Sequence, residues 1–418
     1  MNTPKIRFKG FADDWEQRKF GNLADYKKGP FGSAVTKDMF VPKSDDSVKV
    51  YEQQNAINKD WSLERYFLPN EYALTKLKSF EVHGGDIIVS CAGTIGEIYE
   101  IPEDAEVGII NQALMRVRVN ESIVDKKMFI IAFSNMIDVF SRTHSNGSAI
   151  KNIPPFADLK PMGVMMPSMD EQQKVSGYFE KIDNLITLHQ RKCDETKQLK
   201  KFMLQKMFPK NGEKNPEIRF EGFTDDWEQR KLSEICERIT RKNRNNESDL
   251  PLTIASQFGL IDQRDFFNKI VAAKDMSNYY LLKKGEFAYN KSYSNGFDYG
   301  SIKRLNAYKQ GCLSTLYICF GITSDEVESD YLECFFDTLK WYGDVSMICA
   351  EGARNHGLLN VDTKGFFDEV TVDLPKSLEE QKRISAYLNA LNHLITLHQR
   401  KCEKLKELKK YMLRNMFI

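Results

Sequence analysis

The chain has 418 residues, of which 60 are Lys or Arg and 59 are Asp or Glu, and 41% are hydrophobic. This length fits two to three domains with real hydrophobic cores. The balanced charge excludes a uniformly basic protein, so any site for a polyanion must be local. No apolar run has the length of a membrane span, and the N-terminal residues do not resemble a signal peptide, so we expect a cytoplasmic protein.

The eight cysteines contain no Cys-x-x-Cys pair, and none lies beside a histidine at the spacing of zinc ligands. Because disulfides are rare in cytosolic proteins, we expect reduced structural thiols and no metal site.

Two blocks of the sequence occur twice. Residues 4–20 match residues 216–232 at 13 of 17 positions, and residues 169–208 match residues 378–417 at 21 of 40 positions. Between these blocks lie two variable segments, about 21–168 and 233–377, which barely resemble each other. This order indicates an internal duplication followed by divergence of the intervening segments.

The variable segments nevertheless share a sparse skeleton. Gly85–Ser90 (GDIIVS) and Gly108–Met115 (GIINQALM) correspond in order and spacing to Gly285–Asn290 (GEFAYN) and Gly311–Ile318 (GCLSTLYI). Short β-branched and aromatic runs between Gly and Asn indicate strands and loops, and helical patterns follow at 125–140 and 329–343. We therefore expect two mixed α/β domains of the same fold.

The loops of both segments contain the amides, hydroxyls and cations that contact DNA bases and phosphates. Each loop by itself is weak evidence for DNA contact, but the occurrence of all these loops in the diverged segments is stronger evidence. The candidate DNA contacts are Lys28, Ser33, Lys37, Thr94, Arg142, Ser145 and Asn146 in the first segment, and Arg241, Lys242, Arg244, Lys291, Ser292, Tyr293, Asn295, Arg354, Asn355 and His356 in the second.

The repeated 40-residue blocks are predicted to be long helices. Apolar residues recur at steps of three and four, and each block begins just after a proline. Two such rods would most simply pair as an antiparallel intramolecular coiled coil. The histidines of the stripe could be imagined as metal or catalytic groups, but an interfacial role is favoured. The expected pairing residues are Val175, Phe179, Ile182, Ile186, His189, Leu199 and Met203 in the first helix, and Ile384, Leu388, Leu391, Ile395, His398, Leu405 and Met412 in the second.

This organisation resembles the specificity subunits of Type I restriction-modification systems over essentially the whole chain. Besides the repeats, the resemblance rests on GPFGS at Gly29–Ser33, on PSMDEQ at Pro167–Gln172, on PKSLEEQ at Pro375–Gln381 and on YNKSYSNGFDYGSIKRL at Tyr289–Leu305. It implies two target-recognition domains, each reading one half of a split, asymmetric DNA site. The helices would set the spacer and bind the modification subunits.

The expected architecture is thus α+β with pseudo-twofold internal duplication. It consists of a first recognition domain at 1–168, a helix at 169–208, a linker at 209–217, a second recognition domain at 218–376 and a helix at 377–418. The resemblance further implies double-stranded DNA, two modification subunits and two ATP-dependent restriction subunits as partners. S-adenosylmethionine, ATP and Mg²⁺ would be bound by those partners, and no cofactor by this chain.

Two other classes of function are less well supported. A self-contained hydrolase or transferase acting on nucleic acid should show a catalytic motif, but the sequence has no Gly-Lys of a phosphate-binding loop and no Pro-Asp of the common nuclease motif. Asn152–Phe156 (NIPPF) has one residue too many for an amino-methyltransferase motif, and we interpret it as a loop entering a strand. A coiled-coil scaffold that does not touch DNA would bind without sequence preference. We therefore expect a DNA reader without catalytic residues.

Overall fold

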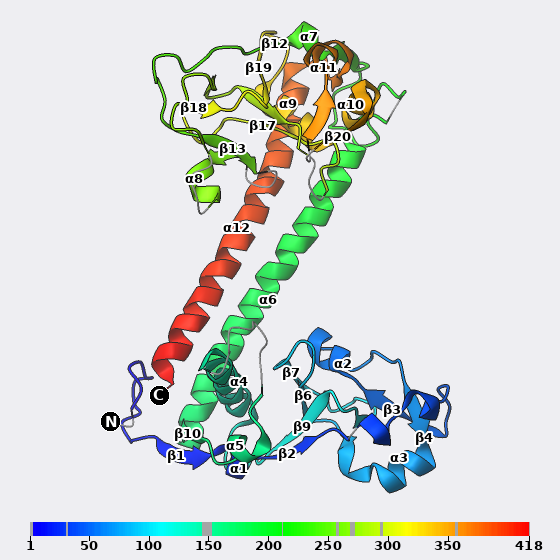
Figure 1. The fold of residues 1–418 in the computed structure, drawn as a ribbon, viewed down its shortest axis with the longest axis vertical. Helices are drawn as coiled ribbons and strands as arrows, with labels where there is room; N and C mark the ends of the chain where they lie inside the picture. The colour runs from blue at the N-terminus through cyan, green and yellow to red at the C-terminus, as the bar shows by residue number, and fades with distance from the viewer. Residues whose placement is uncertain are drawn as a thin grey trace. The chain divides into compact units, whose positions relative to one another are not determined.

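The computed structural model describes residues 3–30, 32–143, 153–210, 212–255, 259–267, 272–292, 296–355 and 358–417 (Figure 1). The chain divides into two compact units. The first unit contains Met1–His189 and Lys401–Ile418, and the second contains Gln190–Arg400. Within the described ranges, every helix is too short or too polar to span a membrane.

The first unit mixes short strands and helices. Its strands are β1 (Glu16–Lys19), β2 (Ala24–Lys28), β3 (Ser47–Tyr51), β4 (Phe67–Pro69), β5 (Glu81–Val82), β6 (Ile87–Ser90), β7 (Ile98–Glu100), β8 (Gly108–Ile110), β9 (Leu114–Val119) and β10 (Gly163–Met166). Its helices are α1 (Phe20–Leu23), η1 (Gly32–Ala34), η2 (Lys37–Met39), α2 (Gln53–Asn58), α3 (Asn70–Lys76), η3 (Lys78–Phe80), α4 (Lys126–Thr143), α5 (Phe156–Leu159) and the first half of α6 (Met169–Lys206).

The second unit has the same mixed character. Its strands are β11 (Glu228–Lys231), β12 (Cys236–Arg238), β13 (Leu252–Ala255), β14 (Gly259–Asp262), β15 (Tyr280–Lys283), β16 (Phe287–Asn290), β17 (Ser301–Arg304), β18 (Gln310–Leu313), β19 (Ile318–Ile322), β20 (Cys349–Asn355), β21 (Leu358–Val361) and β22 (Thr371–Leu374). Its helices are α7 (Leu232–Ile235), α8 (Gln263–Phe266), α9 (Ser329–Asp337), α10 (Tyr342–Ile348), α11 (Thr363–Glu369) and the first half of α12 (Leu378–Met416).

Each unit contains a four-stranded antiparallel sheet with the same connectivity. The strand order is β2-β9-β6-β7 in the first unit and β12-β19-β16-β17 in the second. The predicted mixed α/β fold is therefore present in both units, and the helix expected at 125–140 is confirmed as α4. The helix expected at 329–343 is confirmed only for α9, which ends at Asp337, because Leu339 has a left-handed backbone (φ +62°) and a separate helix, α10, begins at Tyr342.

The strand registers identify equivalent residues in the two sheets. Tyr26 lies opposite Val117, and Arg238 lies opposite Phe320. Tyr26 and Arg238 are 212 residues apart, which is also the offset of the repeated blocks at 4–20 and 216–232. The register of the next strand agrees: Ile87 faces Val117 as Phe287 faces Phe320.

The units differ in the strands outside this sheet. The first unit has a second sheet of order β4-β3-β8-β5, in which β3 and β8 are parallel. The second unit has two separate ribbons, β13–β14 and β15–β18. This difference explains why the variable segments align only at the skeleton that forms the common sheet.

The start of each long helix is built into the core of its own unit. Val175 and Phe179 pack in the core of the first unit, and Ile384, Leu388 and Leu391 pack in that of the second. Each of these cores is completed by the far end of the other helix. Met416 joins the first core, and Met207 and Phe208 join the second. Much of the predicted stripe therefore attaches each helix to a globular core, in addition to any helix pairing.

Contacts between the helices within each unit are antiparallel. In the first unit the ammonium group of Lys409 donates to a carboxylate oxygen of Asp183 at 2.6 Å. In the second unit Cys193 is buried with its sulfur 4.0 Å from the carbonyl oxygen of Ile395. The pairing residues Ile186, His189, Met203, Ile395, His398, Leu405 and Met412 are half-buried, and Ile182 is buried.

Leu199 differs from its predicted place in the pairing stripe, because 41% of its surface is exposed. A strict alternation of three and four residues averages 3.5 residues per turn, whereas a straight helix has 3.6, so the stripe drifts around the helix over several turns. Near this end of α6, Met203 and Leu204 contact the core instead. The prediction that the loop at Asn152–Phe156 leads into a strand is wrong, because helix α5 begins at Phe156.

Candidate nucleic-acid interface

The helix entry of the first unit fixes the start of α6 to the repeated N-terminal block. The guanidinium of Arg7 donates two hydrogen bonds, of 2.7 and 2.8 Å, to the buried carboxylate of Glu171. The amide nitrogen of Gln172 donates to the carbonyl of Pro167 at 2.9 Å, and its oxygen accepts from the backbone of Asp125 at 2.8 Å.

The same arrangement recurs at the entry of α12. The guanidinium of Arg219 donates to the carboxylate of Glu380 at 2.7 and 2.9 Å. The side-chain nitrogen of Gln381 donates to the carbonyl of Pro375 at 2.9 Å, and its side-chain oxygen accepts from the backbone nitrogen of Glu328 at 2.8 Å. The Glu-Gln pairs that mark both helix entries in the sequence are thus structural. The candidate DNA contacts must be sought elsewhere.

Three loops meet at one end of the first unit's sheet. The backbone nitrogen of Gly29, after β2, donates to the carbonyl of Leu114 at 2.8 Å, and that of Cys91, after β6, donates to Ala113 at 2.7 Å. A Cβ at residue 29 would lie 1.8 Å from the carbonyl oxygen of Asn111, so only glycine fits there. The glycine that opens the GPFGS element is required by this close approach.

Only part of the first segment's candidates belongs to this sheet end. Lys28, the last residue of β2, and Thr94, in the loop after β6, are exposed at this end. Ser33 lies in η1, Lys37 is exposed in η2, and Arg142 is exposed in the last turn of α4. Ser145 and Asn146 fall outside the described residues.

The equivalent end of the second unit gathers candidates from separate segments. Lys291 and Ser292 follow β16, where the side chain of Asn290 accepts a hydrogen bond from the backbone of Ser292 at 3.0 Å. The carbonyl of Lys291 accepts from the backbone of Leu359 at 2.9 Å, and Leu359 pairs with Arg354 in the β20–β21 hairpin. The structure therefore brings Lys291 beside the strand that carries Arg354 and Asn355. Tyr293, Asn295 and His356 fall outside the described residues.

The cations after β12 differ in how they are engaged. Arg241 donates to both carboxylate oxygens of Glu286, at 2.9 and 2.7 Å, so its guanidinium has a structural partner. The Lys242 ammonium lies 3.9 Å from the centre of the Tyr280 ring. Arg244 is exposed. Burial, and then the neighbouring charge of Arg238, lower the pKa of Lys291.

Two glutamines near the first unit's sheet end were not among the predicted contacts. Gln112 is exposed in the turn before β9. The side-chain oxygen of Gln53, in the first turn of α2, would lie 3.3 Å from a Cβ at Gly93 and has no hydrogen-bond partner in the described chain. Glutamine can pair with adenine through two hydrogen bonds. No local motif marks Gln53, because the β3–α2 segment reaches this loop only through the tertiary fold.

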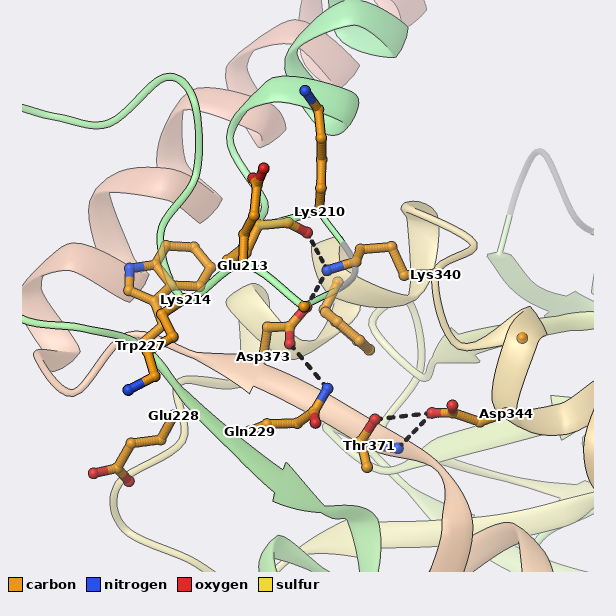
Figure 2. A pocket seen from close by; sticks show the side chains of 14 residues that line it. Lys210, Glu213, Lys214, Trp227, Glu228, Gln229, Lys340, Asp344, Thr371 and Asp373 are labelled. Carbon is orange, nitrogen blue, oxygen red and sulfur yellow. Dashed lines mark hydrogen bonds and ion pairs between the residues drawn. The ribbon is translucent and has the colours of Figure 1, made fainter.

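A cavity of about 370 Å³ lies in the second unit, beside the linker that follows α6 (Figure 2). The Lys340 ammonium donates to Asp373 and to the carbonyl of Pro209, and Asp344 accepts from the backbone and hydroxyl of Thr371 at 2.8 and 2.9 Å. Of these bonds, drawn as dashed lines in Figure 2, the one from Lys340 to Pro209 joins the linker to the globular fold, and the others lie within that fold. Among the described residues no group of His, Cys, Asp and Glu could hold a metal ion.

Comparison with known proteins gives a family match over the first part of the chain. Residues 12–198 match the family model of the Type I restriction modification DNA specificity domain. Residues 12–198 of this chain are thus similar to that DNA specificity domain.

Solved structures agree with this fold. The S subunit of a Type I restriction-modification system from M. genitalium has a TM-score of 0.58 at 14% identity, covering 100% of this chain and 99% of that one. A chain from a study of assembly and conformational transition of the type I R-M system has a TM-score of 0.52 at 15% identity, covering 96% of both chains. No curated protein matches the chain by sequence.

Proposed function

We propose that this chain is the specificity subunit of a Type I restriction-modification system and reads a bipartite DNA site, with one half-site read by each unit. The observation that carries this proposal is the shared four-stranded sheet, whose equivalent strand ends present unrelated loops in the two units. A common framework with different loops is what two readers of different sequences require.

The recognition domains would correspond to 1–168 and 218–376, and the helices at 169–208 and 377–418 would form an antiparallel intramolecular coiled coil that sets the spacer between the half-sites. Helix α6 has 38 residues, which correspond to about 57 Å of helix. The antiparallel contacts of Lys409 with Asp183 and of Cys193 with Ile395 support this pairing.

Two modification subunits would bind to the helices. Exposed apolar side chains recur at equivalent positions of the repeat: Leu185 and Leu394, Leu199 and Leu408, and Phe202 and Tyr411. Each unit therefore carries one set. Exposed apolar residues at matching positions of a duplicated element suit two copies of one partner.

The complete assembly would act in the cytoplasm and would also include two restriction subunits. S-adenosylmethionine would be bound by the modification subunits, and ATP and Mg²⁺ by the restriction subunits. This chain would then be required for both methylation and restriction, because it alone selects the DNA site.

An exchange of residues 21–168 for the matching segment of another specificity subunit tests the division of labour. Sequencing of methylated adenines in cells that carry the complex should show a change in one half-site only. The reciprocal exchange of 233–377 is the matched control and should change the other half-site. A simultaneous change of both half-sites by either exchange would refute independent reading.

A further inference from the structure

Three cations converge at the end of the second unit's sheet. A guanidinium nitrogen of Arg238 donates to the hydroxyl of Tyr280 at 3.3 Å, and the Lys242 ammonium lies 3.9 Å from the centre of the same ring. Lys291 follows β16, near enough to Arg238 for that charge to disfavour its ammonium form. Tyr280 is thus the common neighbour of Arg238 and Lys242. Lys291 lies in the same part of the sheet, because it follows β16, and β12 and β16 both pair with β19.

These cations have no carboxylate partner in the described part of the chain. Arg241 differs, since Glu286 holds it in a bidentate ion pair. Unpaired like charges at close range repel one another, and the partial burial of Lys291 weakens the hydration that would otherwise screen them. A bound anion would remove this repulsion.

The first unit has no such cluster at the equivalent positions. Tyr26 stands where the second unit has Arg238, and Cys91 stands where it has Lys291. Tyr26 is buried, and burial raises the pKa of the Cys91 thiol to about 11, so neither side chain carries a charge at neutral pH. The cluster therefore belongs to the second recognition domain alone.

We propose that Arg238, Lys242 and Lys291 form a clamp for backbone phosphates of the DNA, present only in the second unit. This inference rests on the proposed DNA-reading function. Phosphate fits better than a base edge, because guanine offers acceptors but no net charge to offset three neighbouring cations. The second half-site then supplies most of the salt-dependent affinity, whereas the first is read with little help from phosphate charge.

The experiment measures DNA affinity of the complex with its modification subunits over a series of KCl concentrations. The duplex carries the site found by sequencing methylated DNA. Each of Arg238→Gln, Lys242→Gln and Lys291→Gln should reduce the slope of log affinity against log salt by about 0.9, with the methylated sequence unchanged. Lys364→Gln removes an exposed cation of α11 and should leave the slope unchanged.

A second measurement keeps the protein intact, in case a variant folds poorly. When the wild-type complex binds duplexes with neutral methylphosphonates at successive positions of the second half-site, the slope of log affinity against log salt should fall as it does in the variants. In the complex that carries Arg238→Gln, Lys242→Gln and Lys291→Gln together, methylphosphonates at the clamped phosphates should cause no added loss of affinity. Methylphosphonates in the first half-site should have the smaller effect.

Relaxed specificity at one base pair with an unchanged salt slope would make these residues base readers and overturn the clamp. Unchanged affinity and slope in all three variants would also overturn it. A wild-type complex that bound all sequences equally would instead refute the proposed function, so the two failures can be told apart.

Discussion

Arg7 and Glu171 form a two-bond ion pair that joins segments 164 residues apart, and Arg219 and Glu380 repeat it in the second unit. The Glu171 and Glu380 carboxylates are buried, while the guanidinium groups are 14% exposed. The duplication has therefore kept the joint between the repeated N-terminal block and the helix entry, although the intervening domains have diverged.

Breaking this joint should destabilise the unit that contains it. Glu171→Ala leaves Arg7 without its partner in a largely buried place, and we expect a loss of about 3 kcal/mol in the free energy of unfolding. Hydrogen exchange should show lower protection at the start of α6, with little change at the start of α12. Glu16→Ala removes the exposed Arg18–Glu16 pair and should cost at most about 1 kcal/mol. Equal effects of both variants would show that the buried joint has no special role.

The exposed apolar positions should control the number of modification subunits bound. Leu199→Glu with Phe202→Glu adds charge to the patch of the second unit, and glutamate is a good helix former. Since burying one leucine stabilises an interface by about 1.5–3 kcal/mol, we expect the complex to retain one modification subunit by native mass spectrometry. Leu74→Glu, at an exposed leucine of α3, is the control and should retain two. Two bound subunits in the double variant would place the docking surface elsewhere.

The helices can be tested as a spacer by lengthening both together. Seven residues inserted after His189 and seven after Arg400 lengthen each helix by about 10 Å, near the level where Ile186 faces Cys402 and Cys193 faces Ile395. At about 3.4 Å per base pair, the preferred spacer should grow by about three base pairs. The bases of each half-site should stay the same in methylation sequencing. If a folded complex kept its original spacer, the helices would not measure DNA.

DNA binding should weaken at alkaline pH through Lys291. Burial, and then Arg238, lower the pKa of this lysine in the free protein, whereas a bound phosphate would favour its charged form. Binding therefore takes up a proton once pH passes the lowered pKa, which is below the ordinary value of about 10.4. Affinity should be constant below that pKa and should then fall by up to about tenfold per pH unit.

The matched control is Lys291→Arg, because arginine stays charged over this range. Fluorescence anisotropy of labelled duplex should give a flatter pH profile for Lys291→Arg than for wild type. The same alkaline fall in both proteins would assign the titration to another group.

Much of the architecture was accessible from the sequence because the duplication leaves a direct record. The offset of 212 between the repeated blocks continues into the strand register at Tyr26 and Arg238. The helix beginning at Met169 follows from its apolar periodicity and from Pro167 before it. These features depend on local pattern, which a single sequence contains.

The details of the candidate interface were less accessible because they depend on contacts between distant segments. The sequence marks Arg241 as a basic residue, but only the fold shows that Glu286, 45 positions away, already pairs with it. Gln53 lies beside Gly93 only because α2 packs near β6. Charge and residue type alone do not distinguish an engaged cation from one available to DNA.

The final turns of α12 have a consequence for the order in which the protein folds during synthesis. Trp15 packs edge to face on Phe417, and the backbone nitrogen of Ile6 donates to the carbonyl of Asn415 at 3.0 Å. The second unit is one continuous stretch of chain, whereas the first unit, although translated earlier, needs residues 401–418 to close its core. On the ribosome the first unit therefore cannot complete its core around Trp15 until residues 401–418 have been made. A chaperone that binds nascent chains would therefore find a longer-lived target in the segment around Trp15 than in the second unit, although the second unit is made later.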